Sequence, residues 1–160
     1  MSDQDIRDGE VLLPFDPALT AADARLMFIG RVRSPWRERA SCPHNLRDAL
    51  QRGGGGTVEV DAPYRAGLEG LQGASHVVLL YWLDQARRDL IMQRPRLSGK
   101  LSGVFALRSP VRPNPIGLAV VRVLGLDIAA GRLELAAIDC LDGTPLIDVK
   151  PYIVGIDAVP

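Results

Sequence analysis

Two short stretches of the sequence hold many of the polar side chains that could do chemistry. The first, residues 103–117, reads Gly-Val-Phe-Ala-Leu-Arg-Ser-Pro-Val-Arg-Pro-Asn-Pro-Ile-Gly and carries three prolines within six residues. Each proline fixes its own φ at about −65° and restricts the residue before it, so this loop is stiff. A stiff loop loses little entropy on binding, and the guanidinium groups of Arg108 and Arg112 and the amide of Asn114 suit an anionic ligand. The alternative is a rigid edge connection with solvated arginines.

The second stretch, residues 139–152, reads Asp-Cys-Leu-Asp-Gly-Thr-Pro-Leu-Ile-Asp-Val-Lys-Pro-Tyr. Its Asp-Gly-Thr-Pro segment at 142–145 is typical of a tight turn. Three carboxylates and the ammonium of Lys150 lie in the same stretch, which is more charge than a turn requires. The carboxylates would attract a cationic group and the arginines of residues 103–117 an anionic one. A zwitterion with an extra positive charge could therefore use both stretches.

The composition indicates an ordinary soluble globular protein. The chain has 160 residues, of which 47% are hydrophobic and 24% charged, enough for one domain with a real core. No window approaches the ~20 apolar residues of a membrane span, and the N-terminus Met-Ser-Asp-Gln-Asp does not resemble a signal peptide. We therefore expect a cytoplasmic protein that does not enter a membrane. Its two cysteines, Cys42 and Cys140, are too few for a disulfide framework and are expected to be reduced.

The formal net charge is zero, but the charges are unevenly distributed. Residues 1–24 carry six acids against one base, residues 25–39 five arginines against one acid, and residues 87–112 seven bases against one acid. If the two basic segments meet in space, they form a patch suited to phosphates. The alternative is a compositional preference for arginine, because the chain has only two lysines.

The pattern of apolar residues and breakers predicts a mainly β fold. Strands are expected at residues 26–33, 57–60, 75–83, 104–107, 118–126, 132–139 and 146–150. Residues 46–52 predict a short helix, residues 53–56 a flexible glycine connection, residues 63–71 a turn or short helix, and residues 87–100 a basic loop. Many short strands with Gly and Pro between them favour an all-β barrel or sandwich. Neither βαβ alternation nor a glycine-rich nucleotide motif is present.

Residues 1–24 lack sustained periodicity and contain two prolines. They predict an acidic, loosely ordered arm that docks through its apolar residues Val11, Leu12, Leu13 and Phe15. The predicted division is an arm at 1–24 and a single barrel domain at 25–160.

Five segments in order along the chain resemble the TsaA-like family, also called YaeB-like or TrmO. They are Ile29-Gly30, Ser34-Pro35, Ser75-His76 and the two long stretches 103–117 and 139–152. The best-known members of this family methylate N6 of threonylcarbamoyl-adenosine beside the tRNA anticodon. The resemblance covers roughly residues 26–157. It implies a single-domain antiparallel β-barrel with short helices and long loops, S-adenosylmethionine as methyl donor, tRNA as partner, and a homodimer with cofactor pockets near the subunit interface.

Carried over by residue, the family's cofactor pocket falls on five places. These are Pro43, His44 and Asn45, then His76 and Val77, then Arg108, then Leu118, and then Ile138, Asp139, Cys140 and Leu141. The chemistry of the ligand fits this set. A sulfonium is stabilised by a carboxylate such as Asp139, a methionine carboxylate by a guanidinium such as that of Arg108, and adenine by apolar groups such as Leu118.

The reaction would also need a group that activates the acceptor nitrogen, because an amide-like N6–H is a poor nucleophile. Asp142, Lys150 and Tyr152 are the catalytic candidates, while Arg112 and Asn114, at the loop tip, are expected to face the acceptor or the partner subunit. Cys42, Cys140, His44 and His76 would surround one pocket, yet their spacing matches no zinc pattern, so we expect no metal.

Three features depart from the family pattern. Pro43-His44-Asn45 stands where Pro-Arg-Gln is common, Ala119 replaces a usual serine, and the sequence stops at Pro160, whereas long members carry a further C-terminal domain. We therefore expect a short form, for which two alternatives stay open. One is methylation of a small molecule or another nucleotide, and the other is a non-catalytic S-adenosylmethionine-binding module.

Overall fold

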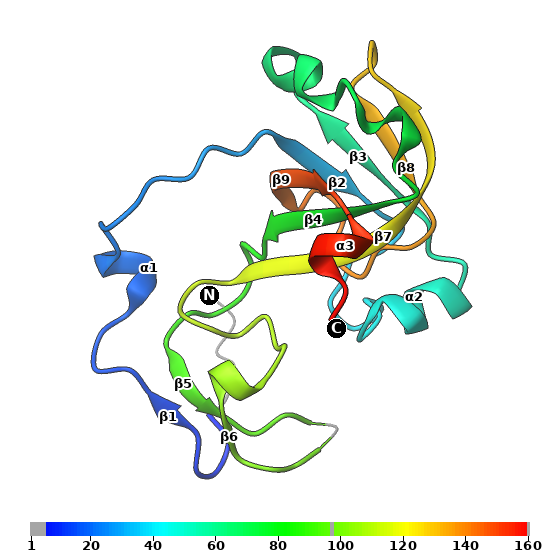
Figure 1. The fold of residues 1–160 in the computed structure, drawn as a ribbon. Helices are drawn as coiled ribbons and strands as arrows, with labels where there is room; N and C mark the ends of the chain where they lie inside the picture. Colours follow the sequence, from blue (N-terminus) through cyan, green and yellow to red (C-terminus); the bar gives the residue numbers. More distant parts are fainter. Residues whose placement is uncertain (1–5, 97, 160) are drawn as a thin grey trace. The chain divides into compact units, whose positions relative to one another are not determined.

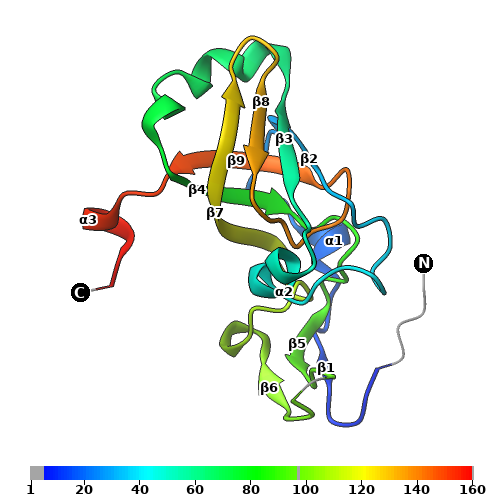
Figure 2. The ribbon, with the colours of Figure 1, turned by 90° about the vertical axis from the view of Figure 1, so that its right-hand side faces the viewer.

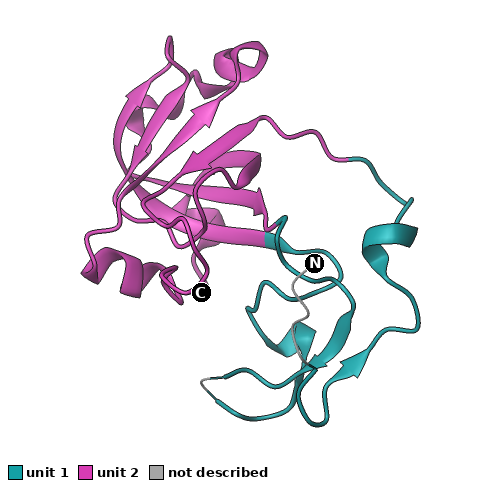
Figure 3. Cartoon of the chain, turned by 180° about the vertical axis from the view of Figure 1, so that it is seen from behind, with its two compact units in different colours: residues 1–25, 84–116 teal, residues 26–83, 117–160 magenta. Residues whose placement is uncertain are grey.

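The computed structural model describes residues 6–96 and 98–159. The chain divides into two compact units (Figure 3). Unit 1 comprises Met1–Arg25 and Asp84–Ile116, and unit 2 comprises Leu26–Leu83 and Gly117–Pro160. Residues 1–5 of the predicted arm lie outside the described residues. The predicted division into an arm and one barrel domain stays a prediction.

Unit 2 contains a closed six-stranded barrel with the strand order β2-β3-β8-β7-β4-β9 (Figures 1 and 2). Its strands are β2 (Gly30–Arg33), β3 (Gly56–Val60), β4 (His76–Trp82), β7 (Ile116–Asp127), β8 (Arg132–Leu135) and β9 (Pro145–Pro151). Short helices connect or follow them: α2 (Leu46–Gln51), the 3₁₀ helices η1 (Ala62–Leu68) and η2 (Leu71–Gly73), and α3 (Val154–Asp157). The predicted mainly β, antiparallel barrel is confirmed.

Alternating apolar side chains along the strands build the barrel core. Val77, Leu79 and Tyr81 of β4 are buried, while the residues between them are only partly buried. The same alternation runs along β2, β7 and β8. Because side chains of a strand point alternately to its two faces, one face of each strand packs into a common interior.

One irregularity in the barrel affects the site described below. On β9, Asp148 pairs with Leu80 of β4, and Leu146 pairs with Tyr81. Ile147 is therefore an extra residue on β9 between these two pairs. Such a β-bulge bends the strand and changes the direction of neighbouring side chains.

Unit 1 contains a three-stranded sheet in the order β1-β5-β6. The strands are β1 (Val11–Leu12), β5 (Leu90–Gln93) and β6 (Ser102–Gly103), accompanied by the helices α1 (Pro17–Thr20) and η3 (Val104–Ala106). Residues 11 and 12 of the predicted arm thus form a strand that pairs with β5.

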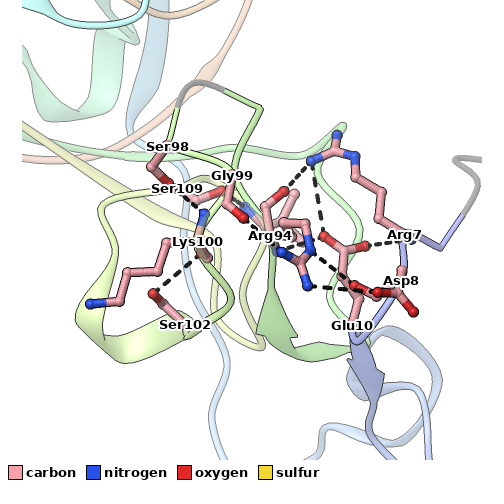
Figure 4. Close-up of polar contacts among 10 residues, drawn as sticks. Arg7, Asp8, Glu10, Arg94, Ser98, Gly99, Lys100, Ser102 and Ser109 are labelled. Carbon is pink, nitrogen blue, oxygen red and sulfur yellow. Dashed lines mark hydrogen bonds and ion pairs between the residues drawn. The ribbon is translucent and has the colours of Figure 1, made fainter.

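A polar cluster holds this N-terminal strand to β5 (Figure 4). The Glu10 carboxylate accepts hydrogen bonds from the backbone N–H groups of Arg94 at 2.8 Å and Arg7 at 3.1 Å. The Arg94 guanidinium in turn donates to the carbonyl oxygens of Asp8 at 3.0 Å and Gly99 at 2.7 Å. The Glu10 side chain is only 4% exposed, so these hydrogen bonds replace the water that the carboxylate loses.

Two sequence predictions in unit 1 are wrong. No strand forms at residues 104–107; instead, Val104–Ala106 form the 3₁₀ helix η3, in which only Val104 is buried. A run of four apolar residues is too short for periodicity to separate a strand from a helix. The predicted basic loop at 87–100 contains β5, whose first residue, Leu90, is buried although it directly follows the charged residues 87–89.

Two predicted strands of unit 2 are shorter than expected. The strand predicted at 26–33 is paired only from Gly30, because residues 26–28 are exposed and precede the ladder. The strand predicted at 132–139 ends at Leu135, and residues 138–141 leave the sheet. Within residues 6–96 and 98–159, every helix falls short of the length and hydropathy that a bilayer-spanning helix requires.

Candidate functional site

The irregular segment 138–141, which follows β8, is held by side chains at every carbonyl. The donors are Trp36 Nε1 to the Ile138 oxygen at 2.7 Å, Cys42 Sγ to Asp139 at 3.3 Å, Ser34 Oγ to Cys140 at 2.8 Å and Thr144 Oγ1 to Leu141 at 2.7 Å. In a strand, the neighbouring backbone would satisfy these oxygens. Here four side chains do so, and they fix the path of a segment that belongs to no ladder. Such a fixed backbone is what a preorganised binding site requires.

Two of these donors, Ser34 and Trp36, come from the turn after β2, which packs against segment 138–141. Ser34 N donates to Asp142 Oδ1 at 3.2 Å, and Asp142 N donates to the Trp36 carbonyl at 2.7 Å. Trp36 is 8% exposed, packs against Ala137, and has the Arg52 guanidinium 4.5 Å above its ring. The Ser-Pro-Trp sequence at residues 34–36 therefore stabilises segment 138–141 through hydrogen bonds and packing.

The Asp139 carboxylate projects from this segment and meets Tyr81 of the barrel. Tyr81 Oη donates to Asp139 Oδ1 at 3.1 Å, while the Asp139 side chain remains half-buried. Burial and the neighbouring carboxylate raise the pKa of the Tyr81 hydroxyl well above its usual value. Tyr81 therefore stays neutral and serves as a hydrogen-bond donor to Asp139.

The loop 43–45 lies beside segment 138–141, because Cys42 immediately before it donates to Asp139. Pro43 is buried, whereas His44 and Asn45 are exposed. Asn45 caps helix α2 by accepting from the backbone N–H of Asp48 at 2.9 Å, and the Asp48 carboxylate accepts from the backbone N–H of His44 at 3.1 Å. These reciprocal bonds fix the backbone of a loop that carries an exposed imidazole.

His76 and Tyr152 form a second cluster, at the start of β4 and just beyond the end of β9. Their ring centroids are 6.4 Å apart in an edge-to-face arrangement, and Ser75 Oγ lies 3.1 Å from His76 Nδ1. The nearby Lys150 ammonium forms an ion pair with Asp148 at 2.6 Å. Each of these polar groups thus has a defined partner.

Within one chain, this second cluster lies far from segment 138–141. Tyr81 and His76 are five residues apart on β4, which corresponds to about 16 Å at the usual rise of a strand. Val77 is fully buried beside His76 and pairs with Pro151. Of the predicted site residues in unit 2, those at 43–45 and 138–142 are therefore brought together, while His76, Val77, Lys150 and Tyr152 gather elsewhere.

Leu118 is 46% exposed on the outer face of β7, next to Gly117, whose backbone packs against the Tyr81 ring. The other three predicted residues belong to unit 1. Arg108 and Asn114 are exposed. The Arg112 guanidinium donates to the carbonyl oxygens of Leu107 at 3.2 Å and Ser109 at 3.4 Å, so it braces its own loop. Their roles toward a cofactor or an acceptor stay predictions.

A groove with a volume of about 570 Å³ opens beside the Ser34 turn. Its lining includes Arg33, Ser34, Arg37, Gly56, Glu134 and Asp142. Within it, Arg37 Nη1 lies 3.4 Å from Asp142 Oδ2. The volume falls in the range of small-ligand sites, roughly 300–1,000 Å³. Asp142 thus borders both segment 138–141 and a space large enough for a nucleoside.

The two cysteines are not activated thiols. Burial and the nearby Asp139 raise the pKa of Cys42 to about 11, and burial raises the pKa of Cys140 well above its usual value. In residues 6–96 and 98–159, no three His, Cys, Asp or Glu side chains gather closely enough to hold a metal ion.

The raised pKa of Cys42 predicts a pH-dependent reactivity. Only the thiolate is alkylated, so modification of Cys42 by iodoacetamide should be slow at pH 7.5 and should rise toward pH 11, about two units above an ordinary thiol. Burial favours the neutral thiol over the thiolate, so the pKa rises and the alkylation rate increases only at higher pH. Mass spectrometry of the alkylated peptide measures the rate, with Cys42→Ser as the control. A half-maximal rate near pH 8.5–9, as in an unperturbed thiol, would contradict the burial of the Cys42 thiol.

Comparison with known proteins identifies the family. Residues 31–158 match the model of the tRNA-methyltransferase O N-terminal domain. The chain belongs to this family. The predicted resemblance is therefore confirmed.

Three relatives show how the tRNA-methyltransferase O family compares with this chain. The "Probable S-adenosyl-L-methionine-binding protein VirR" of Rhizobium radiobacter is 40% identical over 129 residues, which cover 81% of this chain and 71% of VirR. The "tRNA (adenine(37)-N6)-methyltransferase" of Escherichia coli K12 is 34% identical over 140 residues, which cover 82% of this chain and 59% of that enzyme. The crystal structure of TrmO from Pseudomonas aeruginosa, 40% identical, gives a TM-score of 0.68 and covers 86% of this chain and 60% of that one. The chain thus spans about three fifths of the length of the last two relatives.

Sequence reasoning missed two residues that hold the site together. Trp36 and Tyr81 donate hydrogen bonds to segment 138–141 from distant parts of the chain. Inward alternation along residues 75–83 could have placed Tyr81 in the interior. Its pairing with Asp139, 58 residues away, left no local signal.

Proposed function

We propose that the protein is an S-adenosylmethionine-dependent N-methyltransferase that acts on N6 of threonylcarbamoyl-adenosine beside the tRNA anticodon. The observation that carries the proposal is segment 138–141, whose four carbonyls are anchored by side chains and which presents the Asp139 carboxylate. The name of VirR supports the methyl donor, and the name of the E. coli enzyme supports N6 of adenine 37 in tRNA as the acceptor position.

The residues on this segment fit the methyl donor. The half-buried Asp139 carboxylate would lie near the sulfonium, since a carboxylate stabilises a neighbouring positive charge. Leu141, partly buried beside Trp36, would offer an apolar surface to adenine. When bound, the donor supplies a methyl carbon for attack by the acceptor nitrogen, with the S–C electron pair passing to sulfur and the nitrogen's proton leaving to a base.

Asp142 is the base that the arrangement favours. It directly follows segment 138–141, borders the groove, and is held by Ser34 N and the Arg37 guanidinium. A carboxylate fixed in this way would orient an N–H and accept its proton. Positioning of donor and acceptor would supply the rest of the rate enhancement, up to ~7–11 kcal/mol.

Lys150, Tyr152 and His76 would join this site in a homodimer, in which one chain contributes its second cluster to the other chain's cofactor segment. The support is that His76 lies five residues, about 16 Å, along β4 from Tyr81, the residue that contacts Asp139 within the same chain. The arginines of residues 25–39 would contact tRNA phosphates, so binding should weaken steeply with salt.

Labelled methyl transfer tests the function. The protein is incubated with methyl-labelled S-adenosylmethionine and a cell extract, which is then fractionated into RNA, protein and small molecules. We expect label in tRNA, and none in tRNA that lacks the threonylcarbamoyl group. Label in small molecules alone would support methylation of a small molecule, and tight binding with no transfer would support a non-catalytic module.

A further inference from the structure

Tyr81 is a buried tyrosine whose hydroxyl forms a hydrogen bond with Asp139. Its side chain is 4% exposed and continues the inward-facing row of Val77 and Leu79. A third aliphatic residue would fill this row without a polar atom. Instead, the hydroxyl donates to Asp139 Oδ1 at 3.1 Å, so one end of the barrel core contacts segment 138–141.

Two features of the backbone fix the position of the Tyr81 ring. A Cβ atom at Gly117 would lie 2.1 Å from Tyr81 Cε2, so the ring occupies space that only glycine leaves open. The bulge at Ile147 lies directly opposite, between the pairs Leu80–Asp148 and Tyr81–Leu146. Bulges redirect neighbouring side chains and are enriched beside active sites.

We propose that Tyr81 is a positioning residue that aims the Asp139 carboxylate at the sulfonium of bound S-adenosylmethionine. The inference rests on the proposed function. Tyr81 holds Oδ1 of the carboxylate, while Cys42 holds the backbone carbonyl of the same residue at 3.3 Å. Both ends of Asp139 are thereby restrained, and its second carboxylate oxygen has a defined direction.

The consequence concerns charge. S-adenosylmethionine is a cation at sulfur, whereas the product S-adenosylhomocysteine is a neutral thioether of nearly the same shape. A carboxylate that faces the sulfonium stabilises bound S-adenosylmethionine, whereas it contributes little to the binding of the neutral product. The Tyr81 hydroxyl therefore contributes to the preference for substrate over product, and it does so without touching either ligand.

The test is titration calorimetry of Tyr81→Phe, which keeps the ring and removes the hydroxyl. We expect the affinity for S-adenosylmethionine to fall about tenfold, the scale of one hydrogen bond to a charged group, and the affinity for S-adenosylhomocysteine to change less than about twofold. Tyr64→Phe, at another tyrosine packed against the barrel core, is the matched control and should leave both affinities unchanged.

Three results would overturn the inference. An equal loss of both affinities would mean that Tyr81 only supports the fold, and unchanged affinities would mean that its hydroxyl does not direct Asp139. If the unaltered protein bound neither ligand, the proposed function would fail together with the inference. That outcome is distinguishable from the other two, because it is measured on the unaltered protein and not on the Tyr81→Phe variant.

Discussion

Gly117→Ala is expected to lower the free energy of unfolding by about 1–3 kcal/mol, the usual range for overpacking a core. The added methyl group would lie 2.1 Å from Cε2 and 2.5 Å from Cδ2 of Tyr81. The ring is buried and its hydroxyl is bonded to Asp139, so it cannot move aside without losing both packing and a hydrogen bond. In a thermal melt, the midpoint should fall by roughly 2–12 °C, at 2–4 °C per kcal/mol.

A matched alanine variant separates this clash from the general effect of replacing glycine. Gly155 lies in α3, and a Cβ there would have no atom within 4 Å. Gly155→Ala should leave the melting midpoint unchanged or slightly higher. The double variant Gly117→Ala, Tyr81→Leu should recover part of the loss, because the ring that causes the clash is gone. A Gly117→Ala protein as stable as the unaltered one would show that the Tyr81 ring is not seated as described.

Asp139→Asn is expected to weaken S-adenosylmethionine binding by about 10- to 100-fold, the effect of removing a charge partner that contributes about 1.5–3 kcal/mol. The amide keeps the size of the side chain and can still accept from Tyr81, so the fold should persist. The loss should exceed that of Tyr81→Phe, because Asp139 carries the charge and Tyr81 only directs it. Binding of S-adenosylhomocysteine should fall much less.

The control for this variant makes the same change of charge elsewhere in unit 2. Asp61, an exposed residue before η1, makes no side-chain capping bond, so Asp61→Asn should leave the affinity unchanged. Titration calorimetry measures both variants. An Asp139→Asn protein that binds S-adenosylmethionine as tightly as the unaltered protein would remove Asp139 from the site.

The barrel could be predicted from the sequence because its signals are local. Residues 75–83 and 118–126 alternate or are rich in β-branched residues, and they correspond to β4 and β7. The helix predicted at 46–52 corresponds to α2, with Asn45 as its cap. Patterns of this kind depend on neighbours in the chain, which a single sequence displays.

Segment 138–141 could be found by resemblance, but its irregular backbone could not be foreseen. The apolar residues Ala136, Ala137 and Ile138 read as a continuation of β8, whereas the chain leaves the sheet after Leu135. The cause is non-local: the indole of Trp36, 102 residues away, takes the Ile138 carbonyl that a neighbouring strand would otherwise use. The periodicity of apolar residues around Ile138 does not show that a distant indole binds its carbonyl.

The pairing of β1 with β5 was hidden for a similar reason. Val11 and Leu12 are two residues in an acidic context, and their partner β5 lies between arginines and Pro95. Each strand is too short to be predicted alone, and the buried Glu10 that joins them reads as one more surface acid. The sequence also suggested that Arg108 and Asp139 share one ligand; they belong to different units, and their joint role stays a prediction.

The most direct test of the cofactor site is a crystal structure of the protein with S-adenosylmethionine bound. We predict that the ligand lies along segment 138–141 and that its sulfonium faces the Asp139 carboxylate, with Tyr81 still bonded to the other oxygen. A ligand bound away from Ile138–Leu141, or one whose sulfonium turns from Asp139, would contradict the proposed site.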